Sequence, residues 1–229
     1  MKLKLTYLML FTMLGLVACG EDDSQSSTQM SSAITKHAVD NTLSGSNQIS
    51  GISGLGAGAY TVSMGTDEDL KIGTYYQSDN DEKLLIINGE EQKSDLVFYA
   101  FPNQEWVSVV PMQENEVIDI SQHEAIHHEL LNLSSFSGDY HSTYGKVDIE
   151  IKIDDQGNVI SGDSACKLNG KLSQTDLPNM MKYNLTSQAC GDLSSNLKGY
   201  FVKDENYEPA SFRLINLNSS ILDLWFYVN

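Results

Sequence analysis

The chain has 229 residues, of which 31 are acidic and 14 are basic, so its formal net charge is −17 at neutral pH. A surface this acidic repels the phosphate backbones of DNA and RNA, which argues against nucleic-acid binding. The same charge would favour a cationic partner, but solubility is the simpler explanation and the one that we favour.

The first residues have the features of an export signal. Lys2 and Lys4 precede an apolar run that ends at Val17. This run is shorter than the stretch of about 20 apolar residues that a transmembrane helix needs. We therefore predict a signal peptide over residues 1–18. The alternative to the lipoprotein signal described next is a plain signal peptide, in which case Cys19 would be incidental.

The segment Leu16-Val17-Ala18-Cys19 resembles the lipobox of bacterial lipoproteins. The resemblance implies cleavage before Cys19 and lipidation of this residue, and several acyl chains together anchor a protein stably in a membrane. Gly20, in the place where an aspartate can stand, resembles lipoproteins that are forwarded to the outer membrane. We therefore expect a chain lipid-anchored in the cell outer membrane, on its periplasmic face or at the cell surface.

A polar segment follows the anchor. Residues 19–57 are rich in Ser, Thr, Gln, Asn and Gly and contain few apolar side chains. Because this composition is typical of flexible linkers, we expect a disordered tether that holds a folded body off the membrane. Loss of residues 1–18 would leave 12 basic and 31 acidic residues, a net charge of −19.

Short β-branched and aromatic runs begin at residue 58 and continue to residue 111. Turn-forming residues separate them, so we predict an N-terminal β-module of roughly five antiparallel strands. The acidic clusters Asp67-Glu68-Asp69 and Asp79-Asn80-Asp81-Glu82 lack the ligand spacing and the glycine of a calcium loop. We interpret both clusters as acidic turns that need no ion.

Residues 112–135 are expected to link this module to the rest of the chain. Ser121 and Glu124 have the spacing of a capping box, and Ile126, Leu130 and Leu133 recur at helical spacing. The sequence therefore predicts a short linker helix from about Gln122 to Leu133.

The predicted helix contains His123-Glu124-Ala125-Ile126-His127, which matches the zinc-protease pattern H-E-x-x-H. On a helix, His123 and His127 would share one face and could bind one zinc ion, while Glu124 activated a water molecule. The third histidine and the glycine of the extended metzincin pattern are missing, because Leu130 and Leu133 occupy those positions. We favour a linker with incidental histidines over a metal site or a pH-sensitive hinge.

Strand-like patterns resume in residues 136–229. Val147, Ile149, Ile151 and Ile153 alternate with polar residues, which is typical of a strand with one solvent-facing side. Eight short strands over about 90 residues predict a small closed barrel. The predicted fold is therefore all-β, with two antiparallel β-modules joined by a short helix, the second being an eight-stranded barrel.

The cysteine content agrees with export. If Cys19 carries lipid, Cys166 and Cys190 remain as one pair in an oxidising compartment. We predict a disulfide bond between them, which closes a loop of about 25 residues and restricts the unfolded chain by about 3 kcal/mol. Two unpaired buried thiols are the alternative.

This half of the chain carries a second resemblance. Gly138-Asp139-Tyr140, the segment 154–162 (DDQGNVISG), the two cysteines and Gly199-Tyr200 are similar to a module of small Gram-negative outer-membrane lipoproteins. The resemblance covers Phe136 to Asn229 and implies a scaffold only, because the group has no established activity. Gly58-Ala59-Tyr60 is a weak internal echo of Gly138-Asp139-Tyr140.

The last strand contains Trp225 and Phe226, which point to opposite faces. We expect one in the core and the other as a candidate contact for a partner, unless the neighbouring module covers it.

The sequence carries no serine-hydrolase elbow, P-loop or dinucleotide glycine pattern. We therefore expect a non-enzymatic lipoprotein without a cofactor, which binds a protein or a small ligand at the outer membrane. A protein is favoured, because side chains fill the interior of so small a barrel. The alternatives are an inhibitor or immunity-type lipoprotein that neutralises a basic effector, and a zinc metallohydrolase that uses the HEAIH motif.

Overall fold

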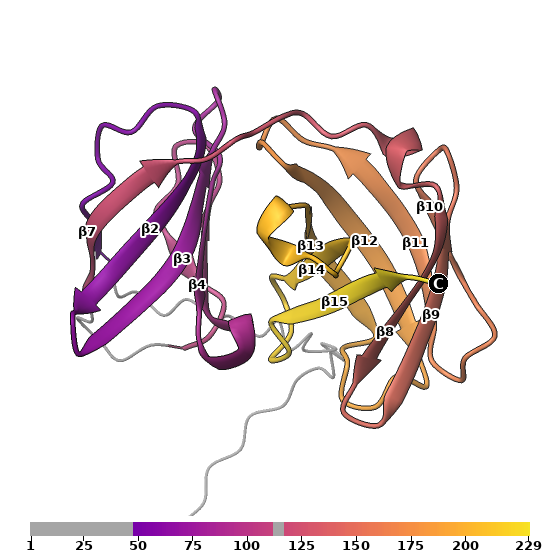
Figure 1. Ribbon diagram of the computed structural model, residues 1–229. Helices are drawn as coiled ribbons and strands as arrows, with labels where there is room; N and C mark the ends of the chain where they lie inside the picture. Colours follow the sequence, from indigo (N-terminus) through magenta and orange to yellow (C-terminus); the bar gives the residue numbers. More distant parts are fainter. Residues whose placement is uncertain (1–47, 112–116) are drawn as a thin grey trace, which may run out of the picture. The chain divides into compact units, whose positions relative to one another are not determined.

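The computed structural model describes residues 48–111 and 117–229, and this part of the chain is all-β (Figure 1). It contains strands and three short 3₁₀ helices, which confirms the predicted fold class. The predicted signal peptide, Cys19 and most of the expected tether lie outside the described residues. Within the described ranges, none of the helices has the length and apolar character needed to cross a membrane.

The first half forms an open, curled sheet with the strand order β1-β7-β2-β3-β4-β5-β6. Neighbouring strands run antiparallel except for β1 and β7, which are parallel. The sheet extends beyond residues 58–111, because β1 precedes this range and β7 follows it. The elements are β1 (Gln48–Ser50), β2 (Gly58–Thr66), β3 (Asp69–Gln77), β4 (Lys83–Asn88), η1 (Glu90–Gln92), β5 (Ser94–Ala100), β6 (Val107–Ser108) and β7 (Val117–Ala125).

The predicted helix from Gln122 to Leu133 is wrong, because the segment begins inside β7 and then runs on without helical hydrogen bonds. Ile118 and Ile120 alternate with exposed residues and are buried in the core of the sheet. The backbone of β7 pairs with β1 on one side and with β2 on the other. Sheet pairing and burial with period two therefore outweigh a helical pattern that covers only three apolar residues.

The second half forms a closed barrel of eight strands, with β15 hydrogen-bonded to β8, which confirms the predicted barrel (Figure 1). Each neighbouring pair is antiparallel. The elements are η2 (Leu133–Phe136), β8 (Gly138–Tyr144), β9 (Val147–Ile153), β10 (Asn158–Ser161), β11 (Lys167–Gln174), β12 (Met180–Gln188), β13 (Asn196–Val202), η3 (Glu205–Tyr207), β14 (Phe212–Asn216) and β15 (Asp223–Val228).

The interior of the barrel is filled by its own side chains. Phe212 stacks between Phe201 and Phe226, with ring centroids 4.2 and 5.0 Å away. Phe136 of η2 packs on Phe201 and helps to close one end. The predicted disulfide between Cys166 and Cys190 is confirmed, and it joins the segments before β11 and after β12, which lie at the opposite end.

The echo between the two halves corresponds to one repeated contact. The phenol of Tyr60 donates a hydrogen bond of 3.1 Å to the carbonyl oxygen of Gly56. The phenol of Tyr140 donates one of the same length to the carbonyl oxygen of Phe136. Each tyrosine therefore links the start of its strand, β2 or β8, to the residue that lies four positions before the tyrosine in the chain.

The sheet and the barrel belong to one compact unit of the chain and share an apolar interface. On the sheet this interface contains Ala59, Tyr76, Leu84, Ile86 and Val97. On the outer surface of the barrel it contains Leu177, Met180, Tyr200, Val202 and Ile215. One face of the sheet thus packs on the barrel, while its other face covers a separate core around Tyr75 and Phe98.

Candidate functional site

The structure does not bring together the residues of the HEAIH motif. His123 and Glu124 are neighbours on β7, so their side chains point to opposite faces of the sheet. The ring of His123 lies edge-on to Tyr60, with the centroids 6.4 Å apart. His127 follows β7 in the extended segment, where four residues span about 13 Å rather than the roughly 6 Å of one helical turn. The geometry that the zinc hypothesis requires is therefore absent.

The arrangement of potential metal-binding side chains elsewhere in the described residues agrees with this result. Within residues 48–111 and 117–229, no three His, Cys, Asp or Glu side chains are grouped so that they could hold a metal ion. His123, Glu124 and His127 are all exposed. The HEAIH segment therefore acts structurally as the end of a strand and the start of a connection.

Trp225 and Phe226 are both part of packed clusters. Phe226 is 0% exposed and lies inside the barrel. Trp225 points outward, where it contacts the ring of Tyr207 at 4.9 Å and lies under the guanidinium of Arg213 at 4.8 Å. The sheet covers this side of the barrel, so neither residue is a free anchor for a partner.

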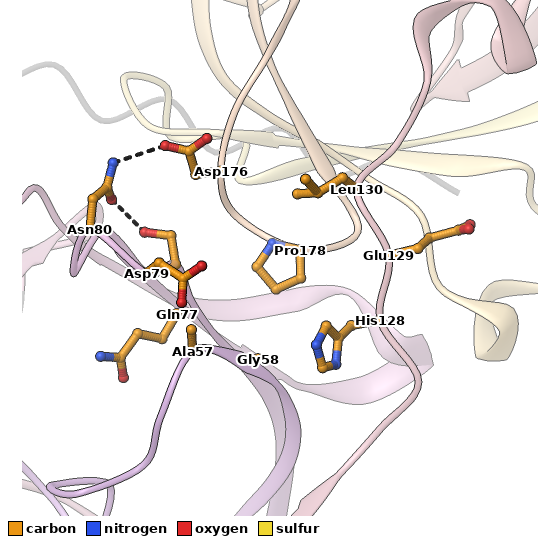
Figure 2. Close-up of a pocket in the computed structure, with 11 residues that line it drawn as sticks. Ala57, Gly58, Gln77, Asp79, Asn80, His128, Glu129, Leu130, Asp176 and Pro178 are labelled. Carbon is orange, nitrogen blue, oxygen red and sulfur yellow. Dashed lines mark hydrogen bonds between the residues drawn. The ribbon is translucent and has the colours of Figure 1, made fainter.

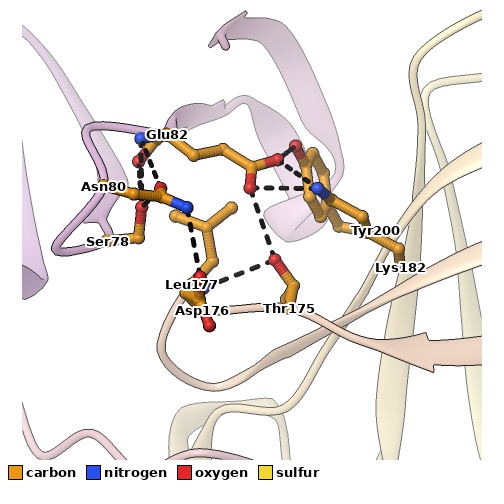
Figure 3. A network of polar contacts seen from close by, with 8 residues as sticks. All are labelled: Ser78, Asn80, Glu82, Thr175, Asp176, Leu177, Lys182 and Tyr200. Carbon is orange, nitrogen blue, oxygen red and sulfur yellow. Dashed lines mark hydrogen bonds and ion pairs between the residues drawn. The ribbon is translucent and has the colours of Figure 1, made fainter. Parts of the chain in front are cut away.

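A buried carboxylate joins the sheet to the barrel just before β4 (Figure 3). Glu82 is only 3% exposed, although it belongs to a cluster that we interpreted as an acidic turn. Its carboxylate accepts a hydrogen bond of 2.6 Å from the phenol of Tyr200 and pairs with the ammonium of Lys182 at 2.8 Å. Burial and this hydrogen bond to Glu82 raise the pKa of Tyr200, so the phenol stays a donor.

A buried arginine makes a second connection at the other end of β4. Arg213 is 0% exposed, and its guanidinium pairs with the carboxylate of Asp223 at 2.6 Å. It also donates to the side chains of Asn88, at 2.9 Å, and Ser94, both of which belong to the sheet. Both ends of β4 are thus fixed to the barrel by charged, hydrogen-bonded side chains.

The connection between the two halves is held in place on both sides. The amide of Ile126 donates to the carbonyl oxygen of Ala59 at 2.9 Å, which continues the sheet. The side chain of Asn179 accepts a hydrogen bond of 2.8 Å from the amide of Glu129 and donates one of 3.0 Å to the carbonyl oxygen of His127. The side-chain amide of Asn179 therefore pairs with the connection much as a neighbouring strand would.

A pocket of about 650 Å³, which we call the junction groove, lies beside the connection (Figure 2). Four segments line it: the start of β2, the end of β3 with the turn after it, the connection after β7, and the loop between β11 and β12. The lining residues are Ala57, Gly58, Gln77, Ser78, Asp79, Asn80, His128, Glu129, Leu130, Asp176 and Pro178.

The connection presents alternate side chains to the two sides. His128 and Leu130 point into the junction groove, while Glu129 points away from it (Figure 2). The carboxylate of Glu129 pairs with Lys203 at 3.2 Å, and both residues line a second, smaller hollow of about 80 Å³. Glu129 therefore contributes little negative charge to the junction groove itself.

Two carboxylates carry the negative charge of the junction groove. Asp176 accepts a hydrogen bond of 3.1 Å from the side-chain amide of Asn80. Asp79 is exposed, and its carboxylate has no ion-pair or hydrogen-bond partner among the residues that the structure describes. Leu130 on the opposite wall is 67% exposed. The groove thus combines an acidic wall with an apolar one.

This site could hardly be predicted from the sequence. Asp79 was visible only as part of an acidic turn, and Leu130 only as part of a predicted helix. Asp176 and Pro178 carry no motif, and they lie about 100 residues from Asp79 along the chain. Only the packing of the sheet on the barrel places these segments together.

Comparison with known proteins finds no matching family model, no matching curated protein and no matching solved structure.

Proposed function

We propose that this chain is a non-enzymatic lipoprotein, anchored in the outer membrane through Cys19, which binds a protein partner in the junction groove. The observation that carries this proposal is the packing of the barrel, whose interior is occupied by Phe201, Phe212 and Phe226. A ligand therefore has to bind on the outside, and the junction groove is the larger of the two hollows described above.

A protein fits this groove better than a small molecule does. Small-molecule sites usually bury most of the ligand and are lined mainly by apolar side chains. The junction groove is open, and its lining contains the exposed side chains of Asp79, His128 and Leu130. An exposed leucine beside polar groups is typical of protein interfaces, in which an apolar centre has a polar rim.

An inhibitor or immunity-type lipoprotein is a narrower version of the same proposal. The net charge of −17 would attract a basic effector and speed their encounter. This version requires that binding abolish an activity of the partner. Assay of the captured protein with and without this chain therefore tests it directly.

Site-specific photo-crosslinking in intact cells tests the proposal. A photoreactive residue replaces Leu130 in the junction groove or, as the control, Ile160 on β10, which is 48% exposed. We expect Leu130 to capture one defined protein that Ile160 does not capture. Identical adducts at both positions, or no protein adduct at Leu130, would contradict the proposal.

Anchoring through Cys19 has a separate test. Cys19→Ser removes the thiol that would carry lipid, so we expect the protein to move from the membrane fraction to the soluble fraction. The control is Gly20→Ser, which introduces a serine beside an intact Cys19 and so reports general effects of the substitution on export. Retention of the Cys19→Ser protein in the outer-membrane fraction would show that the anchor lies elsewhere.

A further inference from the structure

We infer that the junction groove receives a basic segment of a protein, with a lysine or arginine side chain lying across Leu130 and Pro178 and its charged end between Asp79 and Asp176. This inference rests on the proposed function, because it names the chemistry of the partner at the same groove. The proposed function requires only a protein partner. The inference also requires that this partner present a cation flanked by apolar residues.

The shape of the groove favours a long amphipathic side chain. Leu130 is 67% exposed and points into the groove, and Pro178 lies beside it in Figure 2. Lysine and arginine bury their methylene stems along apolar surfaces while their charged ends stay hydrated. A stem on Leu130, with the largely buried Pro178 beside it, would cover the apolar surface that Leu130 leaves exposed.

The charge at the far wall matches such a side chain. Asp79 has no ion-pair partner among the described residues, and Asp176 receives only the neutral amide of Asn80. Lys203, which lines the neighbouring smaller hollow, pairs with Glu129 and not with these two carboxylates. A cation that enters the groove therefore meets two carboxylates whose charge nothing in the lining neutralises.

The groove is rigid enough to select a partner. Asn179 holds its connection wall through two hydrogen bonds to the backbone, and Glu82 holds the turn that carries Asp79 through Tyr200 and Lys182. A surface that is already ordered loses little conformational entropy when it binds.

Synthetic peptides test this chemistry on the purified full-length chain in detergent. The probe is a short peptide in which lysine and leucine alternate, labelled for fluorescence anisotropy. One comparison peptide has glutamate in place of lysine, and another has serine in place of leucine. We expect the lysine–leucine peptide to bind, the lysine–serine peptide to bind several-fold more weakly, and the glutamate–leucine peptide not to bind.

Matched variants separate the groove from the general acidity of the surface. Asp79→Asn with Asp176→Asn should weaken binding of the lysine–leucine peptide about tenfold, because it neutralises both carboxylates that attract the charged end of the lysine. The control, Asp67→Asn with Asp69→Asn, removes the same charge at the β2–β3 turn. The nine residues of β2 separate this turn from Gly58 in the groove. They span about 30 Å, well beyond the screening length at about 0.1 M salt, so we expect less than about a twofold effect.

The outcomes distinguish this inference from the proposed function. Equal loss in the two double variants, or equal binding of the lysine and glutamate peptides, would overturn the inference. If Leu130 still captured a defined protein in cells, the proposed function would stand with a partner of different chemistry. If Leu130 captured nothing while the peptide results held, the groove would bind basic segments without being the site of a cellular partner.

Discussion

The phenol of Tyr200, on the outer surface of the barrel, donates a hydrogen bond of 2.6 Å to the carboxylate of Glu82, at the start of β4 in the sheet. The ammonium of Lys182 pairs with the same carboxylate. A buried charge is tolerated only when such partners compensate its lost hydration. This contact therefore fixes how the sheet packs on the barrel, and with it one wall of the junction groove.

The first prediction concerns this contact. Tyr200→Phe keeps the ring but leaves Glu82 without its phenol donor, so we expect the free energy of unfolding to fall by about 1.5–3 kcal/mol. Tyr227→Phe is the control, because its hydroxyl makes no hydrogen bond with the described residues. Denaturant unfolding monitored by circular dichroism measures both variants. An equal effect of the two substitutions would show that the Glu82 contact adds no stability.

Arg213 is the basis of the second prediction. Arg213→Ala leaves the carboxylate of Asp223 without its cation in a poorly hydrated place and removes donors to Asn88 and Ser94. We expect the free energy of unfolding to fall by about 3–5 kcal/mol, which is the usual cost of removing one partner of a buried ion pair.

An exposed ion pair provides the matched control for Arg213. Lys203→Ala removes the partner of Glu129, and both side chains of that pair are roughly half exposed. We expect the free energy of unfolding to fall by less than about 1 kcal/mol, because water screens such exposed pairs. Thermal unfolding measures both variants. If Lys203→Ala lowered the unfolding temperature more than Arg213→Ala did, the contacts of Arg213 would not be what holds the sheet on the barrel.

Alkaline pH should destabilise the fold through its buried tyrosines. Burial raises the pKa of the phenols of Tyr76, Tyr183, Tyr200 and Tyr207 above the usual value near 10. Above about pH 10 the unfolded chain therefore loses protons that the folded chain retains, and the free energy of unfolding falls with rising pH. Below that pH these groups contribute no pH dependence.

The measurement for this prediction is the phenolate absorbance recorded during an alkaline titration. Part of the phenolate signal should rise together with the loss of near-ultraviolet circular dichroism, because buried phenols ionise only when the protein unfolds. Tyr183→Phe, although it also removes a buried hydrogen bond to Ile215, should reduce that part of the signal. Complete ionisation of all tyrosines in a protein with unchanged circular dichroism would contradict the prediction.

Asn179 provides a prediction with a local readout. Its φ of +57° is accessible to glycine, so Asn179→Gly keeps the backbone and removes the two side-chain hydrogen bonds to the connection. We expect hydrogen exchange at the amide of Glu129 to become about tenfold faster or more. The amide of Ile126, which donates to Ala59, is the internal reference. Equal changes at both amides would point to general loosening instead of a local clamp.

Much of the fold follows from local patterns. Alternation along Val147, Ile149, Ile151 and Ile153 correctly indicated β9, and turn-forming residues marked many of the hairpins. The helix prediction is wrong because Ile126, Leu130 and Leu133 have helical spacing by coincidence, whereas pairing with β2 keeps the preceding residues up to Ala125 in a strand. In the structure Leu130 is exposed whereas Leu131 packs into the barrel core, so these residues form no helical stripe.

The candidate site could not be predicted in the same way. Nothing near Glu82 in sequence indicates that it is buried, because its partners Lys182 and Tyr200 lie about 100 residues further along the chain. The same holds for Asp79 and Asp176, which come to line one groove only after the sheet packs on the barrel. Sites built from separate segments leave no motif, whereas disulfides and strands are encoded by residue type and spacing.

We propose that a partner protein binds in the junction groove through its positive charge. The most direct measurement is the yield of the Leu130 photo-crosslink in intact cells, compared between the native groove and the Asp79→Asn, Asp176→Asn variant. We predict a defined adduct that falls about tenfold in this variant and is unchanged in the Asp67→Asn, Asp69→Asn control. An adduct of equal yield in all three proteins, or none in any of them, would contradict the claim.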